Sequence, residues 1–299
     1  MTKIKRYFRS TRPRNVILGL IALILLFPLF SACTDVVDVE VQTGPERLVV
    51  EASIDWEKGT NGSVQIISLS KSTPFFEEDT LLEVTGANVA VINDTSGIRY
   101  VFTDQNDGSY RTTSFRPILG QSYTLRIEYN GEVYTAQETM TPVTEITNIY
   151  QAREEGFDTE ALEVHVVFTD PPEEGNNYLF KFQREGDLLP ELEYAEDEFV
   201  NGNEIDWWYE IEDDSDLPPF ATGDVVAIEL YGISRSYYDY ISILIDQMGG
   251  VGIFDTTPVA VKGNCINETN PDNYAFGYFR LTEVAKTSYT FVEDASSLD

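Results

Sequence analysis

The amino-acid sequence predicts an all-β protein of two immunoglobulin-like or sandwich-like antiparallel domains, the second with one helix near residues 234–248. Two observations support this fold class. Beyond residue 46, short stretches of alternating apolar and polar residues are separated by turn residues about every ten positions, which is typical of β-sandwiches. Only residues 234–248 place their apolar side chains at the spacing of a helix.

Residues 1–32 have the pattern of a signal peptide. Six basic residues and no acidic residue precede an apolar run from Val16 to Phe30, which is too short to span a bilayer comfortably. The run ends in Phe30-Ser31-Ala32-Cys33, and small residues followed by Cys are similar to the lipobox of bacterial lipoproteins. We therefore expect lipid attachment at Cys33, with residues 33–46 as an acidic tether. An ordinary secretory signal with an incidental Cys is the alternative.

Residues 47–142 are expected to form the first domain. Their apolar and polar residues alternate in short stretches, which we predict as strands at 48–54, 63–69, 87–92, 98–102, 123–129 and 132–136. Asn130-Gly131 lies between the last two stretches and is a strong signal for a tight hairpin. Pro142 follows the last of these strands, so we place the domain boundary there.

Residues 143–299 are expected to form the second domain, with strands at 162–168, 178–182, 225–230 and 275–281. In the predicted helix, Ser234 can cap the first turn and Gly249-Gly250 can end the last. The apolar residues that share one face of this helix are Tyr237, Tyr240, Ile241, Leu244 and Ile245. We expect this face to be buried.

The composition argues against several classes of function. The chain has 51 acidic and 20 basic residues and a net charge of −31, which disfavours nucleic acid as a partner because phosphate binding needs basic patches. With one His and two Cys, few of the familiar hydrolase and zinc constellations can be assembled. No pair of carboxylates is distinguished by its spacing, so we predict no catalytic residue, no metal and no cofactor.

Two local patterns have an ordinary structural explanation. His165 lies on the opposite face of its predicted strand from Val164 and Val166, and we interpret it as an incidental surface or second-face residue. Residues 104–109 resemble a calcium-binding loop, but they are one residue short and no Glu closes the twelfth position. We therefore expect a hairpin turn there.

The segment 191–216 is the most unusual part of the chain. It holds twelve acidic residues and no Lys or Arg, together with two of the three Trp residues. Adjacent Trp207 and Trp208 point to opposite faces of a strand, so one can be buried and the other exposed. The segment is either a solvated acidic loop held by the buried Trp, or a surface for a sugar, a cationic ligand or a basic partner. In the second case, the partner-binding residues are Trp207, Trp208, Tyr209, Glu212, Asp213, Asp214 and Asp216.

Segments throughout the chain are similar to one protein family. They include Val50-Glu51-Ala52-Ser53-Ile54, Gly120-Gln121-Ser122-Tyr123-Thr124-Leu125, Thr139-Met140-Thr141-Pro142, Tyr237-Tyr238-Asp239-Tyr240 and Val261-Lys262-Gly263-Asn264. In this order they resemble a lipoprotein family of Bacteroidota called domain of unknown function 4249. The resemblance implies a cell-envelope lipoprotein, often encoded beside TonB-dependent outer-membrane receptors. It implies no established activity and no catalytic residue.

We therefore expect a non-enzymatic outer-membrane lipoprotein, held in the membrane by its lipid anchor, that binds a ligand or serves a TonB-dependent receptor. The role beside a receptor follows from the resemblance alone. A structural or adhesive surface module is the first alternative, and a hydrolase that uses two carboxylates is the second.

Overall fold

The computed structural model of the protein describes residues 44–73, 82–153, 161–197, 201–211, 217–248 and 260–293. All of them belong to one compact unit, Gly44–Asp299. The predicted signal peptide, the lipidation site and part of the acidic segment lie outside the described residues, and the expectations for them stay predictions. The predicted site residues in these parts are Cys33, Glu212, Asp213, Asp214 and Asp216.

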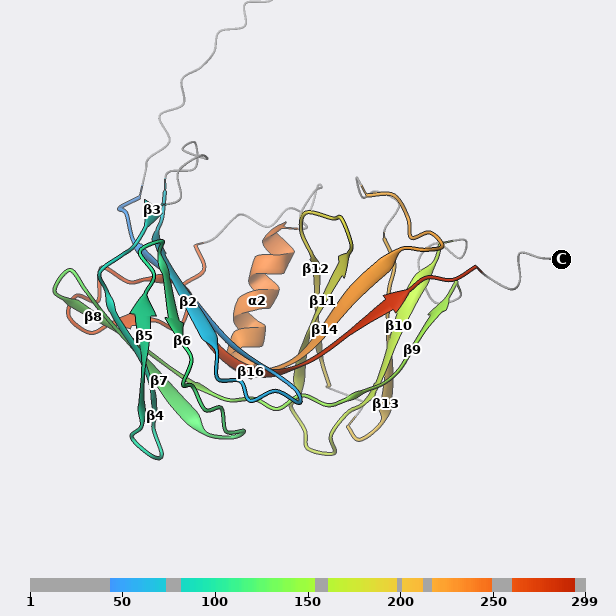
Figure 1. Ribbon diagram of the computed structural model, residues 1–299, viewed down its shortest axis with the longest axis horizontal. Coiled ribbons are helices and arrows are strands. Elements are labelled where there is room, and N and C mark those ends of the chain that lie inside the picture. Colours follow the sequence, from blue (N-terminus) through green and yellow to red (C-terminus); the bar gives the residue numbers. More distant parts are fainter. Residues whose placement is uncertain are drawn as a thin grey trace, which may run out of the picture. The chain divides into compact units, whose positions relative to one another are not determined.

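The described residues form sixteen strands and one helix (Figure 1). The strands of the first half are β1 Leu48–Glu57, β2 Gln65–Lys71, β3 Leu82–Glu83, β4 Asn88–Asn93, β5 Arg99–Asp104, β6 Ser109–Thr112, β7 Ser122–Tyr129 and β8 Glu132–Thr139. Those of the second half are β9 Ile146–Ala152, β10 Glu163–Thr169, β11 Asn177–Arg184, β12 Glu191–Glu196, β13 Glu204–Tyr209, β14 Val225–Ile233, β15 Ile266–Asn267 and β16 Phe276–Thr290. The helix is α2 Arg235–Met248.

The strands pair into two sheets. Thirteen of them form one large sheet in the order β12-β11-β14-β16-β1-β2-β6-β5-β4-β7-β8-β15, with β3 paired to β2. The second sheet has the order β13-β10-β9. Among these strands only the pair of β1 and β16 is parallel. The prediction of an all-β, sandwich-like fold with one helix is confirmed.

The first apolar core is enclosed by β1, β2 and β4–β8. Val50, Ala52 and Ile54 of β1 all face it, because every second side chain of a strand points to the same side. Two completely buried tyrosines bind main-chain carbonyls: the Tyr110 hydroxyl donates to Val84 O at 2.8 Å, and the Tyr123 hydroxyl to Arg116 O at 2.9 Å. The core thus buries two phenol rings without leaving their hydroxyls unsatisfied.

The second apolar core lies between the three-stranded sheet and the far end of the large sheet. Val164, Val166 and Phe168 alternate along β10 and are completely buried, as the sequence pattern predicts. Phe180 of β11 packs against Phe168 with the two rings tilted by 51° and their centroids 5.9 Å apart. The core therefore occupies one face of β10 and leaves the other face for a different set of side chains.

Helix α2 covers the opposite face of β11, β14 and β16 (Figure 1). Ser234 caps it, since Ser234 Oγ accepts a hydrogen bond from Tyr237 N at 3.2 Å. The predicted inner face is confirmed: Tyr237 and Ile241 are buried. Its other three residues, Tyr240, Leu244 and Ile245, pack against the same cluster. In the part of the chain that the structure describes, no helix has both the length and the apolar character needed to span a bilayer.

The fifteen-residue strand β16 belongs to both cores. Phe279 and Leu281 enter the first core, and Ala285 enters the second. At its start, Gly277 has φ of +84°, and a Cβ atom there would lie 2.1 Å from Val50 O, so only glycine permits the close approach to β1. The boundary at Pro142 stays a prediction, but residues 47–142 alone do not complete the first core.

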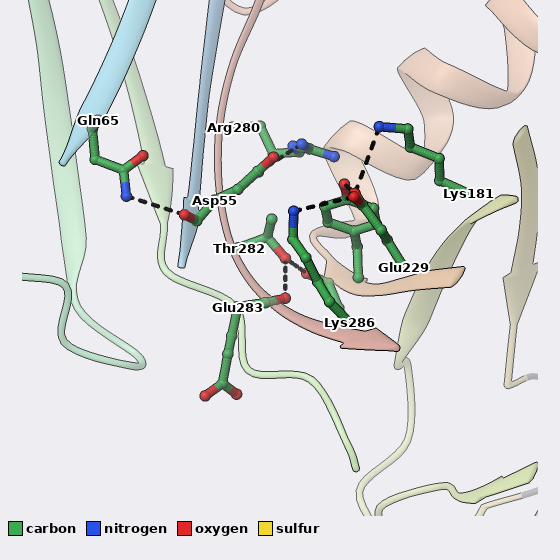
Figure 2. Close-up of polar contacts among 10 residues, drawn as sticks. Asp55, Gln65, Lys181, Glu229, Arg280, Thr282, Glu283 and Lys286 are labelled. Atoms are coloured by element: carbon green, nitrogen blue, oxygen red, sulfur yellow. Dashed lines mark hydrogen bonds and ion pairs between the residues drawn. The ribbon is translucent and has the colours of Figure 1, made fainter. Parts of the chain in front are cut away.

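A partly buried ion pair lies where β16 passes from the first core to the second (Figure 2). Arg280, which is 6% exposed, donates to Asp55 Oδ1 of β1 at 2.6 Å. Its guanidinium also lies 4.8 Å from the ring centroid of Tyr231 and 5.0 Å from that of Tyr237. One side chain therefore contacts β1, β14 and α2.

A row of charges crosses β11, β14 and β16 beside this ion pair (Figure 2). Lys181, Glu229 and Lys286 are register neighbours, and the two ammonium groups lie 3.7 and 3.1 Å from the carboxylate. Glu229 also accepts a hydrogen bond from the Tyr231 hydroxyl. Burial acts to raise the pKa of Glu229, but the hydroxyl and the lysines outweigh burial and hold this pKa below its ordinary value.

Candidate functional site

Strand β13 carries the three aromatic residues that the sequence singles out, and it divides them between its two faces. Trp207 and Tyr209 pack on the second core: their rings stack on Phe180 and Phe182, with centroids 4.8 and 4.5 Å apart. Trp208 lies on the opposite, outer face and is half-buried. Trp207 is thus the Trp that holds the segment to the core, and Trp208 is the one on the outer face of the sheet.

The outer face of the three-stranded sheet brings Trp208 into a row with two other rings. His165 of β10 is the register neighbour of Trp208 on one side and of Tyr150 of β9 on the other. The His165 and Tyr150 rings stack with centroids 4.4 Å apart and an interplanar angle of 16°. Three strands therefore place Tyr150, His165 and Trp208 side by side.

The interpretation of His165 as an incidental residue was wrong in one respect. It lies on the second face of its strand, as expected, but it is 1% exposed and has specific partners. Its Nδ1 lies 2.8 Å from Asp206 Oδ1, and its Nε2 lies 3.3 Å from Glu163 Oε1, whose residue is completely buried. The contact with Asp206 is a hydrogen bond, whereas the contact between Nε2 and Glu163 lacks hydrogen-bond geometry.

Asp206 is the exposed member of this polar group. Its side chain is 44% exposed at the edge strand β13. One oxygen is bonded to His165, and the other accepts a hydrogen bond from the Tyr150 hydroxyl. Because both oxygens are fixed by neighbouring strands, the carboxylate stays in one position between two aromatic side chains, where it can accept hydrogen bonds or attract a cation.

The same geometry is unsuited to a catalytic histidine of the serine-hydrolase type. Such a histidine needs one ring nitrogen directed at the nucleophile while the other is held by a carboxylate. Here both nitrogens of His165 face carboxylates, those of Asp206 and Glu163. Among the described residues, no group of three or more His, Cys, Asp and Glu could hold a metal ion. The arrangement is suited to holding a recognition surface in place.

Sequence reasoning found Trp208 but missed its neighbours Tyr150, His165, Asp206 and Glu163. Part of the signal was present, because Glu163 and His165 alternate onto one face of β10 and Asp206 and Trp208 onto one face of β13. The missing information was the register that joins the strands, since β9, β10 and β13 are separated by long connections.

Solved structures with a similar arrangement are remote in sequence. A cytokine receptor complex has 6% identity and a TM-score of 0.26, with 84% of this chain and 99% of that chain covered. A two-domain fibronectin type-III segment of chicken tenascin has 12% identity and a TM-score of 0.21, with 56% and 84% covered. A DUF4785 family protein of Legionella pneumophila has 12% identity and a TM-score of 0.25, with 61% and 52% covered. Identities and TM-scores this low carry no information on function.

Sequence comparison is more informative about the family. No curated protein matches the chain. The family described as Domain of unknown function (DUF4249) matches residues 34–288, which is nearly everything after the predicted signal peptide and Cys33. The chain therefore belongs to the DUF4249 family.

Proposed function

We propose that the protein is a non-enzymatic lipoprotein of the outer membrane of a Bacteroidota species, anchored through Cys33, that binds a partner or ligand for a TonB-dependent uptake system. The signal-peptide pattern that ends in Ser31-Ala32-Cys33 supports the anchor. The resemblance to a lipoprotein family that accompanies TonB-dependent receptors supports the accessory role. Two or more acyl chains make such attachment effectively permanent.

The observation that carries the binding role is the buried polar group on the outer face of β10. The second core uses only the other face of this strand, so packing does not require His165 and Glu163. Apolar residues in their place would avoid the loss of solvation that buried charges suffer. Their retention is explained if they hold Asp206, Tyr150 and Trp208 as a fixed aromatic and acidic surface. Trp208 and Asp206 would then contact the partner, together with the acidic residues that follow β13.

The proposal predicts that single Trp variants separate binding from folding. Trp208→Ala should reduce copurification of the TonB-dependent receptor with the tagged lipoprotein from outer membranes, while thermal unfolding changes little. Trp207→Ala should lower the unfolding temperature, because its ring stacks on Phe180 in the core. Trp56, which is half-buried in the first half of the chain, provides the matched control, and Trp56→Ala should leave copurification intact.

Two results would contradict the proposal. If Trp208→Ala folds normally and retains the receptor, the binding surface lies elsewhere. If the wild-type lipoprotein copurifies with no TonB-dependent receptor, the accessory role is wrong. Cys33→Ser tests the anchor separately, since it should abolish labelling by a fatty-acid probe and release the protein from the membrane.

A further inference from the structure

A second surface, distant in sequence from the aromatic site, lies on the outward face of β2, β6 and β5. Ile66, Arg111 and Thr103 form a row across the three strands, because Arg111 is the register neighbour of both others. The aliphatic side chains of this face are unusually open to solvent. Val64 is 50% exposed, Ile66 is 49% exposed and Val101 is 58% exposed. Neighbouring exposed apolar side chains on one sheet face are a common feature of interaction sites.

The arginines of this face have no acidic partner, although the chain is strongly acidic. Arg99 and Arg111 are exposed on β5 and β6, and Arg116 follows shortly after β6. Within the part of the chain that the structure describes, none of the three forms an ion pair. By contrast, exposed Arg235 is paired with Glu196 and Asp239. In a chain with 51 acids, the exposed guanidinium groups of Arg99 and Arg111, on the same face of neighbouring strands, are cations that form no ion pair among the described residues.

The face also has a shallow depression. It has a volume of about 320 Å³ and is lined by Val101, Thr103, Gln105, Arg111, Thr112, Thr113 and Ser114. Guanidinium groups bind carboxylates through two parallel hydrogen bonds, and threonine hydroxyls can add further donors. The depression thus offers polar contacts beside the exposed aliphatic side chains.

We propose that this face of β2, β6 and β5 is a docking surface for an acidic, partly apolar polypeptide segment of another protein. The unpaired arginines fit carboxylates, and the exposed Val and Ile side chains fit apolar residues between them. The face is built of aliphatic, hydroxyl and guanidinium groups, whereas sugar binding relies on exposed aromatic rings.

The test uses a labelled peptide of twelve residues that alternates Glu and Val. Its affinity for the full-length protein is measured by fluorescence anisotropy at low and high salt, with a Gln-Val peptide of equal length as the neutral control. Wild-type protein should bind the acidic peptide and not the neutral one. Because exposed charges are screened within about 10 Å at 0.1 M salt, binding should weaken as salt is raised.

Charge reversal tests whether the acidic peptide binds to this face. The double variant Arg99→Glu, Arg111→Glu should bind the peptide about tenfold more weakly or not at all. The control variant Arg235→Glu, Lys262→Glu changes the net charge equally at exposed positions away from this face and should bind like the wild type. Thermal unfolding of the Arg99, Arg111 variant should match that of the wild type, because both side chains are exposed and form no ion pair, and the control should lose only the small contribution of the exposed Arg235 ion pairs.

Several outcomes would overturn the proposal. If both double variants lose the same amount of affinity for the acidic peptide, binding depends on the overall charge of the chain and not on this face. Failure of the wild type to bind the acidic peptide would also exclude this partner. Binding of heparin or of phosphatidylglycerol vesicles without binding of the peptide would identify a different partner class. Arg111-dependent self-association in sedimentation velocity would identify a second copy as the occupant. Loss of receptor copurification in Trp208→Ala is independent of all these outcomes, since that residue lies on β13.

Discussion

Replacing Arg280 tests the idea that one partly buried ion pair joins the two halves of the fold. Arg280→Ala removes the hydrogen bond to Asp55 and leaves that carboxylate, whose side chain is 31% exposed, without its cation. Breaking a fully buried pair costs about 3–5 kcal/mol, and the partial exposure of Asp55 places the cost near the lower limit. Loss of the contacts with the Tyr231 and Tyr237 rings adds roughly 1 kcal/mol. We therefore expect the free energy of unfolding to fall by about 3–4 kcal/mol.

The assay is urea unfolding followed by tryptophan fluorescence and circular dichroism. Trp56 belongs to the first core and Trp207 to the second, so variants with the other Trp residues changed to Phe report on each core separately. Arg280→Ala should move both transitions to lower urea, because the side chain contacts β1 and also α2. Arg280→Met keeps most of the side-chain volume and should be less destabilising, and adding Asp55→Asn should recover part of the remaining loss.

A suitable control is Arg235→Ala, which breaks an ion pair whose arginine is 62% exposed. Exposed pairs contribute little, so this variant should unfold nearly as the wild type does. If Arg280→Ala destabilises the protein no more than Arg235→Ala, the ion pair does not hold the two halves together. If only one of the two cores shifts, the coupling through β16 is wrong.

Three further predictions address other positions. Burial acts to raise the pKa of Glu229, but the Tyr231 hydroxyl and the two lysines lower it below its ordinary value. Because this pKa is lower in the folded protein than the unfolded value of about 4.3, the ionised carboxylate stabilises the fold above that pH, and the stabilisation is lost as the pH falls toward the folded pKa. Glu229→Gln should therefore reduce the pH dependence of urea unfolding below about pH 4.3, and an unchanged profile would contradict this. Burial raises the pKa of Cys265 to about 12, so iodoacetamide at pH 8 should modify this thiol only after unfolding, as mass spectrometry of its peptide can show. Gly277→Ala should lower the unfolding temperature far more than Gly120→Ala, because both have positive φ but only the first has a neighbouring carbonyl in the place of the new methyl group. Equal effects would argue against the close approach.

Features that depend on a few consecutive residues were predictable from the sequence. Asn130 and Gly131 have φ of 50° and 80°, as the tight turn between β7 and β8 requires. Residues 104–109 form the predicted turn between β5 and β6, in which Asp107 accepts hydrogen bonds from Ser109. Alternation along β10 likewise separated the core side chains from those of the outer face, because a strand has a period of two.

The candidate site could not be predicted in this way, because it depends on strand register. His165 meets Asp206, 41 positions later, only because β10 pairs with β13 in one register. A shift of that register by one residue would put Trp207 on the outer face and Trp208 on the core. The choice between them is made by packing of Trp207 and Tyr209 on the rings of β11, which no local pattern contains.

The parallel pairing of β1 with β16 also has a consequence for the order of folding. A ribosome synthesises β1 more than two hundred residues before the strand that completes its side of the sheet, since the register joins Val49 to Phe276. Until then, one edge of β1 is open and the first core lacks Phe279 and Leu281. Contacts of such sequence separation form slowly, because the intervening chain must first be brought together. The nascent chain is therefore expected to stay incompletely folded until its last strand is made, which favours transport in an unfolded state and exposes it to aggregation when chaperones are limiting.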